Sequence, residues 1–367
     1  MKILMLSTDR TIFDKNSSAF KRMLDYSNLF DELHVLVLNV GEKYNMKVSE
    51  SLSIYGTGSK NKFRMFSDAI NLGKKMKDID VVSAQDPFEI GYVGMRISKK
   101  IKAKFHVQIH TDFMSPYFTE VHKLKNIIRK KIAEKIIPQA DGVRVVSERI
   151  KRNIESIKTK TLPIVLPIFV DADKLHGHPS DFDVKKKYPQ FSTIILMIAR
   201  LEPEKDFESA FQALKRVHVI FPDTGLVILG DGSMMDMLKR RVVELGIEQH
   251  VFFEGKKNDI SPYIKTSDIY LHTSLYEGYG MTFIEVAELR LPIVSTRVGI
   301  MGDIFEHGKS AMICQPRDVG CLARNISALI DDKEKLYQIY MEALRNVNEH
   351  LISKDAYMER YKNSLHI

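Results

Sequence analysis

Two glutamates, Glu277 and Glu285, stand eight residues apart around a glycine-bearing loop. The loop follows an apolar run, 269–273, that predicts a buried strand, and it precedes 283–289, which predicts a helix. A glycine-bearing loop at a helix N-terminus exposes backbone N–H groups, which bind anions such as a diphosphate. Carboxylates beside such a site suit another task, because they accept hydrogen bonds from hydroxyl groups. Together these features predict a nucleotide-sugar site.

The alternative is an ordinary strand, loop and helix with two solvated glutamates, because this spacing also arises by chance. Gly278 and Gly280 lie between the two glutamates, and the segment 292–299 follows downstream. This context favours the binding site over the chance match.

With these residues in place, the spacing resembles the E-x7-E signature of retaining glycosyltransferases of the family 4 type. The resemblance implies that Glu277 holds hydroxyls of the donor sugar and Glu285 holds the ribose. It also implies that backbone amides of 280–282 assist at the diphosphate. A UDP- or GDP-sugar would be the donor, and we expect no cofactor and no metal.

Arg200 and Lys205 stand directly after a predicted strand, 193–198. They resemble the family's R-x4-K element, which implies that both cations neutralise the diphosphate. Preplaced cations lower the barrier because a departing diphosphate gains negative charge in the transition state. The alternative is a solvated loop in which the two cations pair only with Glu202 or Glu204, and such exposed pairs contribute little.

Two further segments belong to the donor side. Gly230, Asp231 and Gly232 end a predicted strand and resemble the family's G-x-G turn, although a tight turn without ligand explains them equally well. Residues 253–257 resemble the segment that passes beside the base. The resulting donor-binding set is Glu285, Gly278, Gly280, Met281, Thr282, Gly230 and Lys256.

His110 ends an apolar run in the first half of the chain. Side chains at the carboxyl ends of parallel strands lie where α/β sheets bind ligands. The resemblance implies that His110 contacts the donor sugar or its phosphate, and with Glu277, Arg200 and Lys205 it completes the expected catalytic set. A core histidine without ligand is the alternative. For Asp86, also at a strand end, an acceptor-side role and an N-cap turn stay equally open.

Three positions depart from the family's pattern. The loop 9–18 holds no glycine where relatives commonly have a pair, so its side chains would have to replace backbone contacts. Residues 298–303 lack a second Gly-Gly pair, and Arg290 stands where relatives often have glycine. These changes alter the shape of the loops, so they affect which donor and acceptor are bound more than they affect the fold.

A chain of 367 residues suggests two domains. No apolar run reaches the roughly 18 residues of a transmembrane helix, and Asp9 comes too early for a signal peptide. Cys314 and Cys321 cannot form a disulfide framework, so we expect small apolar residues in a reducing cytoplasm. Residues 1–170 carry a charge of +12 and residues 171–367 carry −4, which indicates different partners for the two halves.

Short apolar runs alternate with helical patterns in both halves, as in parallel α/β sheets. The run 161–170 contains two prolines and suits an extended crossing between domains. The strings 171–173 and 181–183 have the form Asp-x-Asp but lack the strand context of a metal site, so we interpret them as chance. The predicted strands are 2–6, 34–40, 79–84, 104–110, 142–147, 193–198, 225–230, 250–253, 268–272 and 292–296, with helices at 18–29, 91–102, 207–219, 234–245 and over most of 332–365.

The resemblance covers nearly the whole chain and implies the GT-B architecture. This is an α/β fold of two Rossmann-like domains facing a central cleft, with the C-terminal helix returning to the N-terminal domain. We expect a Rossmann-like acceptor domain over 1–168 and a nucleotide-sugar donor domain over 169–345. A tail helix over 346–367 should pack back on the first domain.

The segment 123–137 is basic and amphipathic. Ile128, Ile132 and Ile136 fall on one stripe with Ile127 at its edge. A core-facing helix with a solvated cationic face explains this pattern. The alternative is docking on an anionic membrane surface, where a lipid-linked acceptor would reside. No nucleic-acid-binding motif accompanies the charge, so we expect no nucleic acid partner.

These expectations describe a retaining, metal-independent hexosyltransferase. It would be cytoplasmic or peripheral on the inner face of the membrane, and would move a hexose-type sugar from a nucleoside-diphosphate sugar to a glycan or lipid-linked acceptor, as in bacterial-type surface polysaccharide synthesis. Two alternatives stay open. A nucleotide-sugar epimerase or hydrolase of the same fold would act without an acceptor, and a catalytically weak binding subunit would dock a membrane-bound partner.

Overall fold

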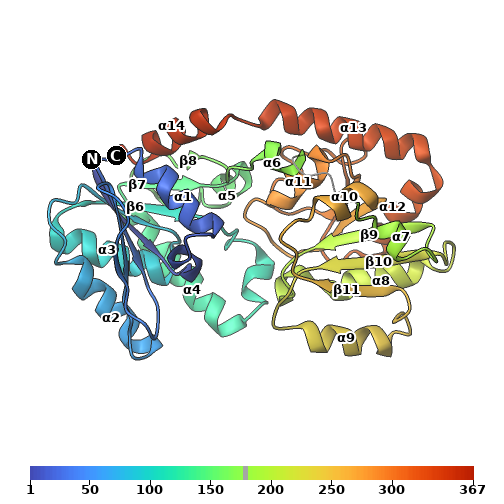
Figure 1. Ribbon diagram of the computed structural model, residues 1–367, viewed down its shortest axis with the longest axis horizontal. Helices are drawn as coiled ribbons and strands as arrows, with labels where there is room; N and C mark the ends of the chain where they lie inside the picture. The colour runs from blue at the N-terminus through green and yellow to red at the C-terminus, as the bar shows by residue number, and fades with distance from the viewer. Residues whose placement is uncertain (177–180) are drawn as a thin grey trace. The chain divides into compact units, whose positions relative to one another are not determined.

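Parallel strands joined by helices build both halves of the chain in the computed structural model, which describes residues 1–176 and 181–367 (Figure 1). The chain divides into two units. Unit 1 comprises Met1–Pro167 and Ile352–Ile367, and unit 2 comprises Ile168–Leu351. Each unit has its own sheet and its own buried core, as expected for two Rossmann-like α/β domains.

Unit 1 is built on an eight-stranded sheet in the order β3-β4-β2-β1-β5-β6-β7-β8. Neighbouring strands are parallel except at one edge, where β3 pairs antiparallel with β4. The central strands are continuous apolar runs because they are buried on both faces. The strands are β1 Lys2–Ser7, β2 Glu32–Val37, β3 Asn45–Lys47, β4 Leu52–Gly56, β5 Val81–Ala84, β6 Lys104–Ile109, β7 Gly142–Val145 and β8 Ile164–Val165.

Several helices of unit 1 begin at a side-chain cap. Ser17 accepts a hydrogen bond from a backbone N–H in the first turn of α1, and Ser147 does the same for α5. The helices are η1 Arg10–Phe13, α1 Ser18–Ser27, α2 Lys62–Gly73, α3 Glu89–Ile101, η2 Pro116–Thr119, α4 Lys123–Ile136, η3 Ile137–Gln139, α5 Glu148–Asn153 and α14 Lys354–Ser364.

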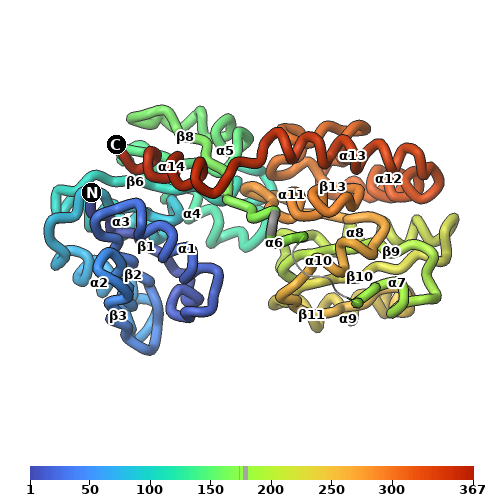
Figure 2. Tube along the Cα trace, turned by 45° about the horizontal axis from the view of Figure 1, so that its top comes forward, coloured from blue at the N-terminus to red at the C-terminus, as the bar shows by residue number. Residues whose placement is uncertain are grey.

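The last helix, α14, packs within unit 1 although it ends the sequence (Figure 2). Tyr361 of α14 stacks on Tyr26 of α1 with ring centroids 4.0 Å apart. The buried Arg144 of β7 lies 5.2 Å from the ring centroid of Tyr361 and donates a hydrogen bond to the hydroxyl of Tyr357 at 3.0 Å. The cation of Arg144, packed against Tyr361 and bonded to Tyr357, holds the tail helix on the N-terminal sheet.

The second domain boundary differs from the expected one at 345. Helix α13 runs unbroken through Lys333–His350, and all of it belongs to unit 2. The interior of a helix cannot separate two packing units, so the division falls at Leu351, where α13 has ended. Residues 177–180, which fall in the expected donor domain, lie outside the described residues.

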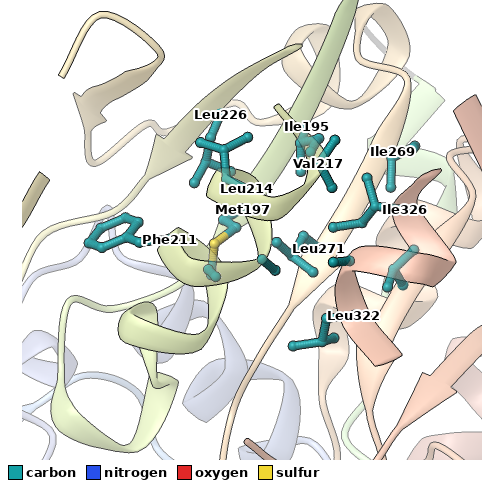
Figure 3. Close-up of a cluster of buried hydrophobic side chains, with 14 of the residues drawn as sticks. Ile195, Met197, Phe211, Leu214, Val217, Leu226, Ile269, Leu271, Leu322 and Ile326 are labelled. Atoms are coloured by element: carbon teal, nitrogen blue, oxygen red, sulfur yellow. The ribbon is translucent and has the colours of Figure 1, made fainter. Parts of the chain in front are cut away.

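Unit 2 is built on six parallel strands in the order β11-β10-β9-β12-β13-β14. Figure 3 shows part of its core, where side chains of α8 and α12 surround those of the central strands. The strands are β9 Thr193–Ile198, β10 Thr224–Leu229, β11 Val251–Gly255, β12 Ile269–His272, β13 Ile293–Thr296 and β14 Met312–Cys314.

Helix α8 shows how unit 2 covers its sheet. Its apolar residues recur every three or four positions, and Phe207, Phe211 and Leu214 are buried against the strands. The helices of unit 2 are α6 Ala172–His176, α7 Val184–Lys187, η4 Pro203–Lys205, α8 Phe207–Val217, α9 Met235–Glu244, α10 Ser261–Thr266, α11 Met281–Glu288, α12 Val319–Asp331 and α13 Lys333–His350.

Cys314 and Cys321 form a disulfide, which corrects the expectation that each is an isolated small residue. Cys314 ends β14 and Cys321 lies in the first turn of α12. The connecting turn brings their Cα atoms to 5.8 Å, a separation that a disulfide spans. The approach depends on the geometry of the turn, which the spacing of the two cysteines does not specify.

Helix α4 is rotated away from the stripe predicted for it. Ile136 is buried, but Ile132 is only partly buried and Ile128 is 59% exposed. The buried face includes Asn126, whose side-chain amide donates to two carbonyls of the preceding turn at 2.8 and 2.6 Å. A buried amide needs these partners, so hydrogen bonding as well as apolar packing sets the rotation. Leu124 is left 80% exposed.

The Asp-x-Asp strings have structural roles. Asp171 pairs with Lys174 at 2.7 Å, and Asp183 caps α7 by accepting from the N–H of Lys185 at 2.8 Å. Within residues 1–176 and 181–367, no group of three or more His, Cys, Asp or Glu side chains is placed to hold a metal ion. In the same residues, no helix is both long and apolar enough to cross a membrane.

Candidate functional site

All strands of unit 2 are parallel, so the loops that follow them lie together at the carboxyl ends of the strands. We call this side of the sheet its carboxyl edge. Backbone hydrogen bonds join neighbouring loops. Leu201 N donates to Asp231 O at 3.0 Å, and Leu275 N donates to Glu204 O at 2.8 Å. This edge gathers every predicted site residue except His110, namely Arg200, Lys205, Gly230, Lys256, Glu277, Gly278, Gly280, Met281, Thr282 and Glu285.

Glu277 is held by three donors that all reach one oxygen. The ammonium of Lys205, Nε2 of His272 at 3.1 Å and the hydroxyl of Ser274 at 2.8 Å bond to Oε1. Within the described residues no hydrogen bond ends on Oε2. Burial opposes ionisation, but Lys205 and His272 outweigh it and hold the pKa of Glu277 well below its usual value. The carboxylate is therefore ionised, and its second oxygen can accept hydrogen bonds from a ligand.

Arg200 and Lys205 have different partners. Arg200 donates from Nη2 to Glu204 at 3.0 Å, and its side chain is 73% exposed. This is the solvated-loop arrangement, and such a pair is weak enough to exchange for a ligand. Lys205 instead pairs with Glu277 from another loop, and its side chain is only 12% exposed. The alternative that both cations pair with Glu202 or Glu204 is therefore wrong for Lys205.

Gly230 is explained by the approach of two loops. Its φ is +143°, and a Cβ there would lie 1.8 Å from the carbonyl oxygen of Ala199. Any side chain would push the loop after β9, which carries Arg200, away from the loop after β10. The glycine serves to bring these loops together, so its presence requires no ligand.

Gly280 opens helix α11 with a φ of +91°. Phe283 N donates to Gly280 O at 3.0 Å, which starts the first turn. For the N–H groups of Met281 and Thr282, no acceptor is found in the part of the chain that the structure describes. Free N–H groups at a helix N-terminus bind anions, so this end of α11 can hold a phosphate.

Glu285 lies on α11, four residues after Met281, the first residue of the helix. It is partly buried, and burial raises the pKa of its carboxyl. No donor bonds to it among the residues whose positions are described, in contrast to the three that hold Glu277. A partly buried acceptor without a protein donor is suited to a ligand hydroxyl.

Lys256 follows β11 and is exposed. The neighbouring Glu254 accepts from Tyr188, from Tyr263 at 2.9 Å and from Lys257 at 3.1 Å. Although burial opposes ionisation, these donors together with Lys187 lower the pKa of Glu254 to about 2. Glu254 thus links the segment 253–257 to residues of α7 and α10.

His110 follows β6 in unit 1. Its Nε2 lies 3.2 Å from Oε1 of Gln108, which also accepts from Nη1 of Arg144 at 2.8 Å. Since Arg144 can only donate, this oxygen is an acceptor and His110 must donate to it. Burial, reinforced by the charge of Arg144, lowers the pKa of His110 to about 3. The ring is therefore neutral, and its Nδ1 can accept a hydrogen bond.

Asp86 also ends a strand of unit 1, and it shapes the turn into α3. Its Oδ1 accepts from Phe88 N at 2.8 Å. Burial raises the pKa of Asp86 to about 6, against the weaker effect of that hydrogen bond. Its hydrogen bond therefore supports the turn interpretation, but the N-cap position of α3 is Phe88 and not Asp86.

The sequence analysis did not include Tyr270, His272 and Ser274 among the site residues. His272 ends strand β12 and contacts Glu277, and Tyr270 contacts His272 from two residues earlier. A histidine at the end of an apolar strand was the signal used for His110, and the same signal identifies His272.

Comparison with known proteins matches both halves of the chain. Residues 181–346 match the family described as Glycosyl transferases group 1, and residues 29–174 match Glycosyltransferase Family 4. The chain is 27% identical to N-acetyl-alpha-D-glucosaminyl L-malate synthase of Bacillus anthracis over 214 residues, which are 58% of this chain and 54% of that protein. It is 22% identical to alpha-monoglucosyldiacylglycerol synthase of Streptococcus pneumoniae over 243 residues, 64% of this chain and 55% of that protein. The chain spans about half the length of the curated relatives it matches.

A solved structure extends the likeness to the whole fold. HepE of Anabaena, in complex with UDP and glucose, superposes with a TM-score of 0.76 at 18% identity, over 100% of this chain and 99% of that one. The two-domain α/β architecture is therefore the GT-B fold. Because the two family matches together cover 29–174 and 181–346, the chain belongs to the glycosyltransferases of group 1 and family 4.

Proposed function

We propose that the protein is a retaining hexosyltransferase that moves a hexose-type sugar from a nucleoside-diphosphate sugar to a glycan or lipid-linked acceptor. The observation that carries this proposal is the state of Glu277. Its carboxylate is ionised and fixed through Oε1 by three donors, and no donor among the described residues reaches Oε2. A carboxylate prepared in this way is an acceptor for sugar hydroxyl groups.

The other groups at this edge match the remaining parts of such a donor. Lys205 and the exposed Arg200 supply positive charge for the diphosphate, and the free N–H groups of Met281 and Thr282 add hydrogen bonds to it. Glu285 has no donor among residues 1–176 and 181–367, and in this proposal it accepts the ribose hydroxyls. Bound cations and amides stabilise the diphosphate as its charge grows on departure.

The charge state of Glu277 bears on how retention is achieved. A carboxylate whose pKa is depressed by Lys205 is a weak nucleophile, and it has three donors on one oxygen. A covalent sugar intermediate on this group is therefore disfavoured. We infer that the acceptor attacks on the same face from which the diphosphate departs, with Lys205 balancing the charge, and that His110 contacts the donor sugar or phosphate as a neutral ring.

The acceptor side includes a membrane surface in this proposal. One similar protein makes a glucosylated diacylglycerol and another makes a glycosylated malate, judged by their names. On α4 the apolar Leu124 and Ile128 are exposed, and Lys131 and Lys135 share their face at helical spacing. We call these four residues the α4 patch. Exposed apolar side chains among lysines suit the interface of an anionic bilayer.

The proposed function is tested by ligand stabilisation. Purified protein is heated with UDP-, GDP- and ADP-sugars without added metal, and its unfolding midpoint is recorded. A donor at 100 times its Kd stabilises the folded state by about 2.7 kcal/mol, which raises the midpoint of a domain of this size by roughly 5–10 °C. A selective shift identifies the donor for an acceptor screen. No shift with any sugar nucleotide contradicts the proposal, and binding without transfer to any acceptor pool favours the partner-subunit alternative.

A further inference from the structure

Strand β12 carries two polar side chains into the core of unit 2. Tyr270 is fully buried and His272 is 3% exposed, and residues two apart on a strand share one face. The Tyr270 hydroxyl lies 3.0 Å from Nδ1 of His272, and Nε2 of His272 lies 3.1 Å from Oε1 of Glu277. A continuous polar row therefore runs from inside the sheet to the carboxylate of the site.

The direction of the hydrogen bonds in this row is determined by its two ends. Glu277 is ionised and can only accept, so Nε2 of His272 carries a proton and donates. Burial lowers the pKa of His272 and raises that of Tyr270, so the ring is neutral and the phenol keeps its proton. Nδ1 of His272 must then accept from the Tyr270 hydroxyl. No reversal of the bond between His272 and Glu277 is compatible with the charge of Glu277, and the Tyr270 hydroxyl also has the carbonyl of Ile198 as an acceptor at 3.5 Å.

His272 is also fixed by packing. Its ring meets the buried ring of Phe283 edge to face, with centroids 4.6 Å apart. Phe283 belongs to the first turn of α11, the helix whose N-terminus faces the site. The N–H group of His272 is thus held in place by the strand and by ring packing. The ammonium of Lys205, in contrast, is carried by a long side chain with many rotamers.

This difference matters when a donor binds. Under the proposed function, Lys205 contacts the diphosphate, and its ammonium cannot then serve Glu277 alone. His272 and Ser274 have no other assigned partner at the ligand and keep their bonds to Oε1. The orientation of the carboxylate, with Oε2 toward the sugar, would then rest chiefly on His272.

We propose that His272, held in one tautomer by its bonds to Glu277 and Tyr270, is a positioning residue that keeps Glu277 oriented toward the donor sugar during transfer. The proposal rests on the function proposed above. It adds two side chains of strand β12 to the groups on which the reaction depends, and neither of them touches the substrate.

Three variants of the full chain test this role. His272→Leu removes the donor to Glu277, and His272→Gln keeps an N–H group that can reach Oε1. Tyr270→Phe removes the hydroxyl that bonds Nδ1 of His272 and that also interacts with the side chain of Thr282. Loss of a hydrogen bond to a charged group predicts a kcat about 10-fold or more lower for His272→Leu, with donor KM changed less than about 3-fold. His272→Gln should recover kcat to within about 3-fold, and Tyr270→Phe should lower it by about 2–5-fold.

His218 supplies a matched control. It is a partly buried histidine of the same unit, and its Nε2 lies 2.7 Å from the carbonyl of Thr224 at the start of β10, the amino edge of the sheet. His218→Leu should lower the unfolding midpoint but leave kcat unchanged. If the role of His272 is purely structural, kcat should stay close to the wild-type value in both His272→Leu and His218→Leu.

The outcomes separate the two proposals. If the wild-type chain turns over a sugar nucleotide but His272→Leu keeps its kcat, or His272→Gln falls as far as His272→Leu, the positioning role is overturned and the proposed function stands. If the wild-type chain turns over no sugar nucleotide with any acceptor, the proposed function fails and the positioning role fails with it. A selective loss of kcat in His272→Leu that His272→Gln restores supports both.

Discussion

Glu277→Gln changes the charge of the central carboxylate and almost nothing of its shape. The three donors on Oε1 keep an acceptor only if the amide oxygen takes that position. The amide nitrogen then replaces Oε2 and presents N–H groups where a sugar hydroxyl would donate. The variant therefore turns an acceptor into a donor at the oxygen proposed to meet the ligand.

The size of the effect follows from these contacts. One hydrogen bond to a charged group contributes about 1.5–3 kcal/mol, and each 1.4 kcal/mol corresponds to a factor of about 10. We expect kcat/KM to fall by about 10- to 150-fold. Lys205, mostly buried, loses its counterion but keeps a neutral acceptor, which should cost about 1–3 kcal/mol of unfolding free energy, or roughly 3–10 °C in the midpoint.

The pH dependence of that stability difference has a definite sign. The pKa of Glu277 in the folded protein lies below the unfolded value near 4.3, so its ionised form is favoured by folding. Its stabilisation is complete at pH values above about 5–6 and is lost as pH falls below about 4. The gap in midpoint between wild type and Glu277→Gln should therefore be largest near neutral pH and should narrow in acid.

Glu285→Gln is the matched comparison, because the same chemical change falls on a carboxylate that no donor in the described part of the chain reaches. Burial raises the pKa of Glu285, so a neutral amide should leave stability unchanged or slightly higher, while the loss of a ribose acceptor raises the donor KM. Thermal unfolding and steady-state transfer on both variants check this. The reasoning is refuted if Glu277→Gln keeps kcat/KM within 3-fold of wild type, or if Glu285→Gln is the less stable of the two.

Three further changes test other parts of the chain. Asp86→Asn should be more stable than wild type by up to about 3 kcal/mol at pH 7.5 but not at pH 4. The pKa of Asp86 is about 6 in the folded protein and about 4 in the unfolded chain, so ionisation of the wild-type residue destabilises the folded state as pH rises through this interval. Denaturant unfolding at both pH values measures the difference. Arg290→Gly should stabilise the chain by about 0.5–1 kcal/mol, because Arg290 has a φ of +62° just beyond α11, where glycine is favoured; an unchanged unfolding midpoint would contradict it. Leu124→Ser with Ile128→Ser should abolish co-sedimentation with anionic phosphatidylglycerol vesicles and leave transfer to a water-soluble acceptor unchanged, whereas equal binding by the double variant would exclude the α4 patch as a docking surface.

The strands that carry the site were predictable because they are buried runs of apolar residues. The predicted run 193–198 coincides with β9, and 268–272 differs from β12 by one residue. β3 and β14 were missed because each has only three residues, too few for a period to appear. The rotation of α4 was missed for a different reason, since a buried amide, Asn126, contributes to it and an apolar pattern does not register that contribution.

The two glutamates show where prediction from spacing ends. Spacing and family resemblance predict that both Glu277 and Glu285 are acceptors, and nothing in an eight-residue interval distinguishes their environments. In the structure Glu277 is ionised and accepts three hydrogen bonds on one oxygen. Glu285 is partly buried, and no donor among the described residues bonds to it. The difference comes from Lys205, 72 residues away in sequence, and from His272, which the motif does not include. A motif therefore specifies which atoms can meet a ligand, while the charge and orientation of those atoms are set by the strand and loop beside them. For this reason substitutions at His272 are the more informative experiment: they change the environment of Glu277 and leave the motif itself intact.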